Sequence, residues 1–343
     1  MWSRRLVIVS LVLTLTVVTC GSATDHRATK EVLETVVTQL TDSPQTTTLP
    51  TGAPATPVET EALSATDTPA ATEEPSALVT PREDLLDQVM AAGKLVVSTD
   101  PDYPPQSFTD EAGELAGFDV DVAREVAKRL GVGIEFESPD WDMITAGHWG
   151  GRWDVSIGSM TPTEARAEVL WFTDPYYFTP ASFAVHTDNT TIQTSDDLVG
   201  KTVGLGTATT YEDYLKGTLS IMGGEVAYDP PPDVKIRPYL TDAYAFEDMK
   251  LGDGARMDAV MSAQLTIQEA INDGYPLKFV GTPAFYEPLV FALDKAGGSP
   301  DKMLLELNAI IAAMHEDGTL TNLSLKWYGI DITRLVKPEQ TEP

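Results

Sequence analysis

The sequence predicts an α/β protein of two lobes, each a mainly parallel sheet flanked by helices. Of its 343 residues, 42% are hydrophobic, which is enough apolar material for one large or two medium cores. Beyond residue 82, short apolar runs alternate with helical patterns, as is typical of parallel strands covered by helices. This region of roughly 250 residues exceeds one typical domain, so we expect two lobes.

The sequence predicts individual helices and strands and some of the residues that end them. Residues 118–131 predict an amphipathic helix, because their apolar positions recur on one face and Gly131 can end it. A second helix is expected over residues 211–219, after a loop rich in Gly and Thr. Strands are expected at Leu95–Thr99, Ile134–Glu137, Trp153–Ile157, Lys201–Leu205, Ala259–Met261 and Lys278–Val280.

The first twenty residues predict an export signal. Arg4 and Arg5 precede an apolar run, residues 6–18, which is shorter than the roughly 20 residues that span a bilayer. Cys20 comes directly after this run and resembles the cysteine of a bacterial lipobox. The resemblance implies cleavage before Cys20, a lipid on its thiol, and a mature protein anchored outside the cytoplasmic membrane. A plain secretory signal with an incidental cysteine is the alternative.

Residues 21–82 are rich in Thr, Pro, Ala and Glu. Such a segment buries too little apolar surface to offset its ordering entropy. We therefore expect a disordered tether between the lipid and the lobes. Residues 332–343 are expected to form a short tail.

Charge and cysteine content exclude several functions. The chain carries 52 acidic and 23 basic side chains, a net charge of −29, which argues against a nucleic-acid partner. Cys20 is its single cysteine, so neither an intrachain disulfide nor a Cys-based metal site is expected. The histidines lack metal-ligand spacing, and no metal or cofactor is expected. They are His26, His148, His186 and His315.

Six motifs in order carry a family resemblance: Ser98–Pro105, Gly117–Ala123, Trp153–Val155, Arg166–Tyr176, Asp258–Val260, and Asp317–Thr319 leading to Lys326–Gly329. From about Gly93 to Gly329 the chain resembles the family 3 extracellular solute-binding proteins of ABC importers, the amino-acid-binding group. The resemblance implies the type II periplasmic-binding-protein fold, in which two crossing hinge strands join two lobes around a ligand cleft. Lobe 1 would comprise residues 83–176 and 289–331, and lobe 2 residues 182–283.

The same resemblance implies the binding residues. Arg166 matches the arginine that clamps a ligand carboxylate, a task suited to the planar fork of a guanidinium. Ser159, Met160 and Thr161 follow a strand where parallel sheets bind ligands, and backbone groups of Ser159 and Thr161 would complete the carboxylate cradle. The further implied contacts are Thr209 and Thr210 from lobe 2, and Tyr103 and Trp141 as a sandwich beside Asp100. Each assignment has a structural alternative. Arg166 would be a solvated surface charge, residues 159–161 a turn between a strand and a helix, and Trp141 a core residue.

One expected group is missing. In the family an acidic residue usually follows the Asp-Ala-Val strand and pairs with the ligand's α-ammonium, but here Ser262, Ala263 and Gln264 follow it. A buried ammonium without a counter-charge would cost several kcal/mol. Either Asp100 or Glu287 takes over, or the ligand is not an ordinary α-amino acid. Ser262 and Gln264 would then hydrogen-bond a neutral polar ligand.

The resemblance implies a non-catalytic function, namely capture of an amino acid or similar small carboxylate outside the cell. The expected partners are an ABC permease and, through the N-terminal lipid, the membrane, with the protein itself a monomer. A ligand-sensing subunit of a signalling system is one alternative. The other is an enzyme resembling cyclohexadienyl dehydratase, with Glu287 or Asp142 as general acid.

Overall fold

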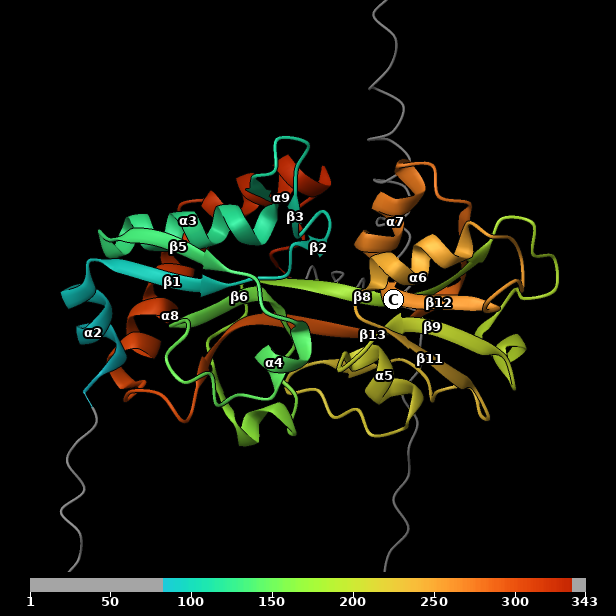
Figure 1. The fold of residues 1–343 in the computed structure, drawn as a ribbon, viewed down its shortest axis with the longest axis horizontal. Coiled ribbons are helices and arrows are strands. Elements are labelled where there is room, and N and C mark those ends of the chain that lie inside the picture. The colour runs from blue at the N-terminus through green and yellow to red at the C-terminus, as the bar shows by residue number, and fades with distance from the viewer. Residues whose placement is uncertain (1–82, 335–343) are drawn as a thin grey trace, which may run out of the picture.

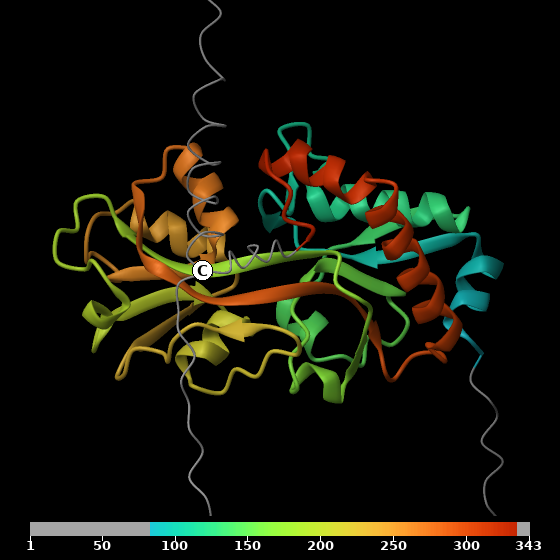
Figure 2. The ribbon, with the colours of Figure 1, turned by 180° about the vertical axis from the view of Figure 1, so that it is seen from behind.

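The computed structural model describes residues 83–334 and has two lobes that lie side by side (Figure 1). Two long antiparallel strands, β8 (Tyr177–His186) and β13 (Leu277–Asp294), run from one lobe into the other. Figure 2 shows the same pair from behind, spanning both halves of the molecule. The crossing strands make one continuous path of strands through the protein, in the order β11-β9-β12-β8-β13-β6-β1-β5.

Lobe 1 is built around β1 (Lys94–Ser98), which pairs in parallel with β5 (Gly133–Glu137) and β6 (Val155–Met160). The end of β13 adds an antiparallel neighbour to β6 and to β7 (Leu170–Phe172). The helices of this lobe are α2 (Leu85–Ala92), α3 (Phe118–Leu130), α4 (Trp141–Thr145), α8 (Asp301–Glu316), α9 (Thr319–Tyr328) and the 3₁₀ turn Arg166–Glu168. A small separate sheet comprises β2 (Asp102–Tyr103), β3 (Ser107–Thr109) and β4 (Leu115–Ala116).

Lobe 2 is built around β9 (Thr202–Gly206), which pairs in parallel with β11 (Lys235–Tyr239) and β12 (Ala259–Ala263). Strand β8 lies antiparallel to β12, and the short β10 (Glu225–Val226) pairs with β13. The helices of this lobe are α5 (Thr210–Leu215), α6 (Asp242–Met249), α7 (Gln264–Asn272) and the 3₁₀ turn Ser195–Leu198. The predicted mainly parallel sheets are confirmed in both lobes, with β8 and β13 as the antiparallel members.

The helix predicted over residues 118–131 is confirmed as α3. Gly131 adopts the left-handed conformation, with φ of 75°, and its N–H bonds back to the Ala127 carbonyl, which ends the helix. The helix predicted over 211–219 is shorter than expected. α5 ends at Leu215 because Gly217 is left-handed, with φ of 68°, and turns the chain away.

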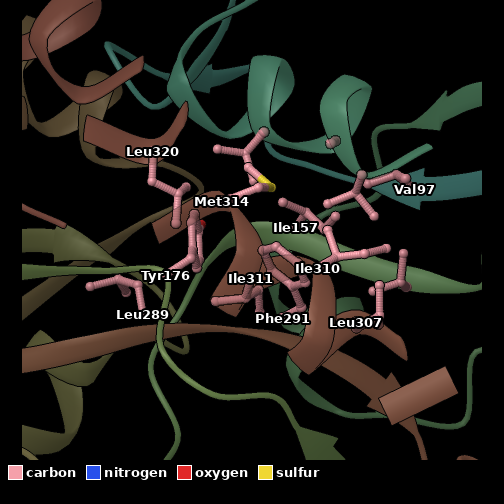
Figure 3. Close-up of a cluster of buried hydrophobic side chains, with 14 of the residues drawn as sticks. Val97, Ile157, Tyr176, Leu289, Phe291, Leu307, Ile310, Ile311, Met314 and Leu320 are labelled. Atoms are coloured by element: carbon pink, nitrogen blue, oxygen red, sulfur yellow. The ribbon is translucent and has the colours of Figure 1, made fainter. Parts of the chain in front are cut away.

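The core of lobe 1 lies between its sheet and helices (Figure 3). Val97, Ile157 and Phe291 come from the strands and meet Leu307 and Met314 of α8, all fully buried. Each such side chain contributes roughly 1.5–3 kcal/mol when it leaves water. Lobe 2 has separate buried clusters, one including Phe183, Leu205 and Phe285 and the other Phe246, Met249 and Ile267.

The predicted signal, Cys20 and the tether over residues 21–82 lie outside the described residues, as does the tail from residue 335. Within residues 83–334, no helix has the length and apolar character needed to cross a bilayer.

Gly117 precedes α3 with a φ of 126°, and a Cβ added there would lie 2.3 Å from the Gln106 carbonyl oxygen. We predict that Gly117→Ala lowers the free energy of unfolding by roughly 3 kcal/mol, because backbone strain and a backbone clash add together. Urea unfolding followed by circular dichroism measures the loss. Gly150→Ala is the control, since Gly150 also has positive φ, 67°, but open space around its Cβ. Equal losses in the two variants would contradict the clash.

Candidate ligand-binding cleft

A cavity lies between the lobes, with about 550 Å³ of open space including its mouth. It sits where β1 and β6 of lobe 1 and β9 of lobe 2 end, the usual place for ligands in open α/β sheets. Its lining comprises Asp100, Tyr103, Trp141, Gly158, Ser159, Thr161, Arg166, Gly206, Thr207, Thr209, Thr210, Tyr211, Leu240, Thr241, Asp242, Glu287 and Leu289.

Most of the residues predicted from the sequence meet in this cavity. They are Asp100, Tyr103, Trp141, Ser159, Thr161, Arg166, Thr209 and Thr210. Three others do not line it. The Met160 side chain packs in the core with Trp149 because side chains alternate along a strand. The Ser262 hydroxyl donates to the carboxylate of Asp242, and Gln264 is buried at the start of α7.

Arg166 is held in the cavity by carbonyl groups from both lobes. Its Nη1 donates to the Thr161 carbonyl and its Nη2 to the Ala208 carbonyl, both at 2.9 Å. The guanidinium also lies over the Trp141 ring, 5.5 Å from its centroid. Only 6% of the residue is exposed, and this burial lowers the pKa of Arg166, opposed chiefly by the charge of Glu287. Arg166 is thus a fixed, dehydrated cation facing both lobes.

Ser159 has a supporting role that differs from the expected one. Its Oγ donates to Asp119 at 2.6 Å, and its N–H donates to the Tyr176 hydroxyl at 3.1 Å. Tyr176 in turn donates to Asp119 at 2.6 Å. Both donors of Ser159 are therefore engaged within lobe 1, and the contribution of its backbone groups to a carboxylate cradle stays a prediction.

Asp242, which the sequence reasoning missed, is the first residue of α6 and is 5% exposed. Its Oδ1 accepts the Gly206 N–H at 2.7 Å and its Oδ2 accepts the Ser262 hydroxyl at 2.5 Å. Burial raises the pKa of Asp242 to about 6, and the charge of Asp100 adds to the shift. The available signal was an acid directly after a threonine that can begin a helix, but acids in the first turn of a helix usually stabilise only that helix.

Glu287 connects the two lobes from the crossing strand β13. Its Oε2 accepts the Thr161 hydroxyl at 2.6 Å and the Thr210 hydroxyl at 2.9 Å. Burial raises the pKa of Glu287 to about 7, although both hydrogen bonds and Arg166 favour the charged form. Because Thr161 belongs to lobe 1 and Thr210 to lobe 2, this carboxyl group ties the lobes together at the cavity.

Further contacts hold the lobes against each other around the cavity. The hydroxyls of Tyr103 and Tyr211 lie 3.1 Å apart, and Trp141 Nε1 donates to the Ala208 carbonyl at 3.2 Å. On the Arg166 side, the Met222 N–H donates to the Pro162 carbonyl at 2.9 Å. The structure is therefore a closed one. Within residues 83–334, no group of three or more His, Cys, Asp or Glu side chains is placed to hold a metal ion.

Residues 95–330 match the family of bacterial extracellular solute-binding proteins, family 3. The chain belongs to this family. It is 34% identical over 256 residues to the L-cystine-binding protein TcyJ of Escherichia coli strain K12, covering 74% of this chain and 89% of that protein. It is 30% identical over 241 residues to the ABC transporter arginine-binding protein 1 of the same strain, covering 69% and 92%.

A solved structure supports the same assignment. The ancestral amino-acid-binding protein AncCDT-1, a precursor of cyclohexadienyl dehydratase, is 32% identical with a TM-score of 0.61, covering 71% of this chain and 99% of that chain. The predicted family and two-lobed fold are thereby confirmed. The family member described here is an extracytoplasmic solute-binding protein of an ABC importer.

Glu287 predicts a pH dependence of stability. Its pKa rises from an ordinary 4.5 to about 7 on folding, so the folded state binds the proton more tightly and the free energy of unfolding falls as pH rises through this window. We predict that the loss of stability between pH 5 and pH 8 is smaller in Glu287→Gln than in the wild type, by about 2 kcal/mol.

Urea unfolding at the two pH values measures this difference. Glu306→Gln is the control, because it makes the same change at an exposed position on α8. The control should follow the wild type. If Glu287→Gln also follows the wild type, Glu287 does not hold a proton in the folded protein near neutral pH.

Proposed function

We propose that this protein captures an amino acid, or a closely related small carboxylate, in the interlobe cleft and delivers it to the permease of an ABC importer. The observation that carries the proposal is Arg166, a buried guanidinium that faces both lobes. Its planar fork makes two parallel charge-assisted bonds to a carboxylate. Its relatives include a cystine-binding and an arginine-binding protein, which supports an amino acid as the ligand.

The cleft is shaped for a small ligand that both lobes enclose. Thr209 and Thr210 start α5 on the lobe 2 side, opposite Arg166 on the lobe 1 side. Tyr103 and Trp141 add ring faces for the ligand's side chain. A ligand bound here would replace water in the cleft and hold the lobes closed, and a closed, loaded form is what a permease must distinguish from an empty one.

The proposal also covers the protein's location in the cell, its lipid anchor and its oligomeric state. We place the mature protein on the outer face of the cytoplasmic membrane or in the periplasm, held by a lipid on Cys20 and acting as a monomer. The signal pattern before Cys20 supports the lipid. Labelling with a clickable palmitate analogue, with Cys20→Ser as the control, tests it directly.

A second candidate function rests on Glu287. A buried carboxyl group with a pKa of about 7 is suited to general acid catalysis, and a similar structure is an ancestor of cyclohexadienyl dehydratase. Binding without catalysis is the proposal we prefer, because the relatives that match most of this chain are solute-binding proteins. Incubation with prephenate or arogenate and detection of the aromatic product separates the two.

We predict that one of the common L-amino acids raises the melting temperature strongly, since a ligand at 100 times its dissociation constant adds about 2.7 kcal/mol to the free energy of unfolding. Arg166→Ala should weaken that ligand's binding by roughly 2–5 kcal/mol, because the carboxylate loses its charged partner in a dehydrated cleft. Thermal-shift screening followed by calorimetry measures both effects.

Arg152→Ala is the control, because Arg152 is an exposed arginine that stacks on Trp153 outside the cavity. It should bind as the wild type does. Binding by Arg166→Ala within threefold of the wild type would refute the carboxylate clamp.

A further inference from the structure

The charges that line the cleft are unequal. Among residues 83–334, three carboxyl groups line the cavity, those of Asp100, Asp242 and Glu287, and Arg166 is the single basic side chain. An ordinary amino acid is a zwitterion and adds no net charge. Its carboxylate and ammonium would therefore leave the excess of acidic groups uncompensated in a site of low dielectric.

The negative charge of Glu287 has partners within the protein. It accepts two threonine hydroxyls, and the positive charge of Arg166 acts on it from nearby. Asp100 and Asp242 have no such cation. Asp100 accepts the Asp102 N–H, and Asp242 accepts one N–H and one hydroxyl. These two carboxyl groups are the excess charge of the site.

Asp100 and Asp242 line the cavity from opposite lobes. Asp100 lies in the short turn between β1 and β2, while Asp242 begins α6, which packs against β2. Each lines the same cavity, and the charge of Asp100 adds to the effect of burial, which is the main cause of the raised pKa of Asp242. Each lobe thus contributes one acid to the cavity.

The end of β12 carries no charge. Ala263, its last residue, is fully buried and uncharged. Its neighbour Ser262 instead donates to Asp242 and fixes that carboxylate in place. The acid that lobe 2 contributes to the cavity therefore lies at the start of α6 and not at the end of β12.

We propose that the cleft selects amino acids that carry a second positively charged group, with Arg166 holding the carboxylate and Asp242 and Asp100 as counter-charges for the two cationic groups. This inference rests on the proposed function. Tyr103, the last residue of β2, lines the cavity and offers a ring face to the same cations. Thr241 adds a cavity-lining hydroxyl oxygen that is buried and has no hydrogen-bond partner among the described residues, so it is available to a ligand N–H.

Two pairs of ligands of matched shape test the inference by calorimetry on the full chain. L-arginine is compared with L-citrulline, and L-lysine with L-norleucine. Each pair differs in the side-chain charge and shares the α-amino acid group. We expect at least one of the two cationic ligands to bind tenfold or more tightly than its neutral partner.

Asp242→Asn should lower the preferred cation's affinity at least tenfold more than that of its neutral partner, and Asp100→Asn should act in the same direction. Asp142→Asn is the control. It removes the same charge beside Trp141, but Asp142 is exposed and does not line the cavity, so the preference should remain within twofold of the wild type.

The inference is overturned if the neutral member of both pairs binds as tightly as the cation, or if Asp242→Asn weakens both members equally. In either case amino-acid binding itself persists and the proposed function stands. If no amino acid binds at all, neither in these pairs nor in a screen of the common L-amino acids, the proposed function fails and the inference with it.

Discussion

A buried guanidinium in an interlobe cleft is costly unless its surroundings compensate for the water it has lost. Arg166 receives that compensation from the carbonyls of Thr161 and Ala208 and from the charge of Glu287. These partners come from lobe 1, lobe 2 and a crossing strand respectively. The position of this one cation therefore depends on how the lobes meet, and the arrangement of the lobes at the cleft depends in turn on Arg166.

The remainder of lobe 1 forms a rigid support for that arrangement. Asp119, at the start of α3, accepts hydrogen bonds from Ser159 and from Tyr176, which comes just before β8. Burial raises the pKa of Asp119 to about 7. The network thus couples the cavity floor to the entrance of a crossing strand. A displacement of Ser159 would therefore also displace Tyr176 before the crossing strand β8, because buried polar groups have few alternative hydrogen-bond partners.

The sequence predicted the fold well because fold depends on repeated local patterns. Three patterns predicted the same two-lobed α/β fold: alternating strands and helices, Gly131 as a helix end, and the motifs in their order. Arg166, Tyr103 and Trp141 were found by matching motifs, and the cavity contains them. The lipid on Cys20, the tether over residues 21–82 and the lobe boundaries stay predictions.

The features that the sequence did not predict depend on tertiary contacts. Met160 and Ser159 lie in consecutive positions of one strand, and no local pattern says which of two opposite faces meets the ligand. Asp242 was missed because its role depends on α6 packing beside β9 and Ser262, which are distant in sequence. Which hydroxyls remain free for a ligand is likewise decided by tertiary partners, as Ser159 demonstrates.

The central claim is that Arg166 holds the carboxylate of an amino acid between the lobes. A crystal structure of the protein with the amino acid that gives the largest thermal shift tests it most directly. The account predicts both carboxylate oxygens within hydrogen-bonding distance of the Arg166 guanidinium, at roughly 2.7–2.9 Å. A ligand bound in the cleft with its carboxylate away from Arg166 would contradict it.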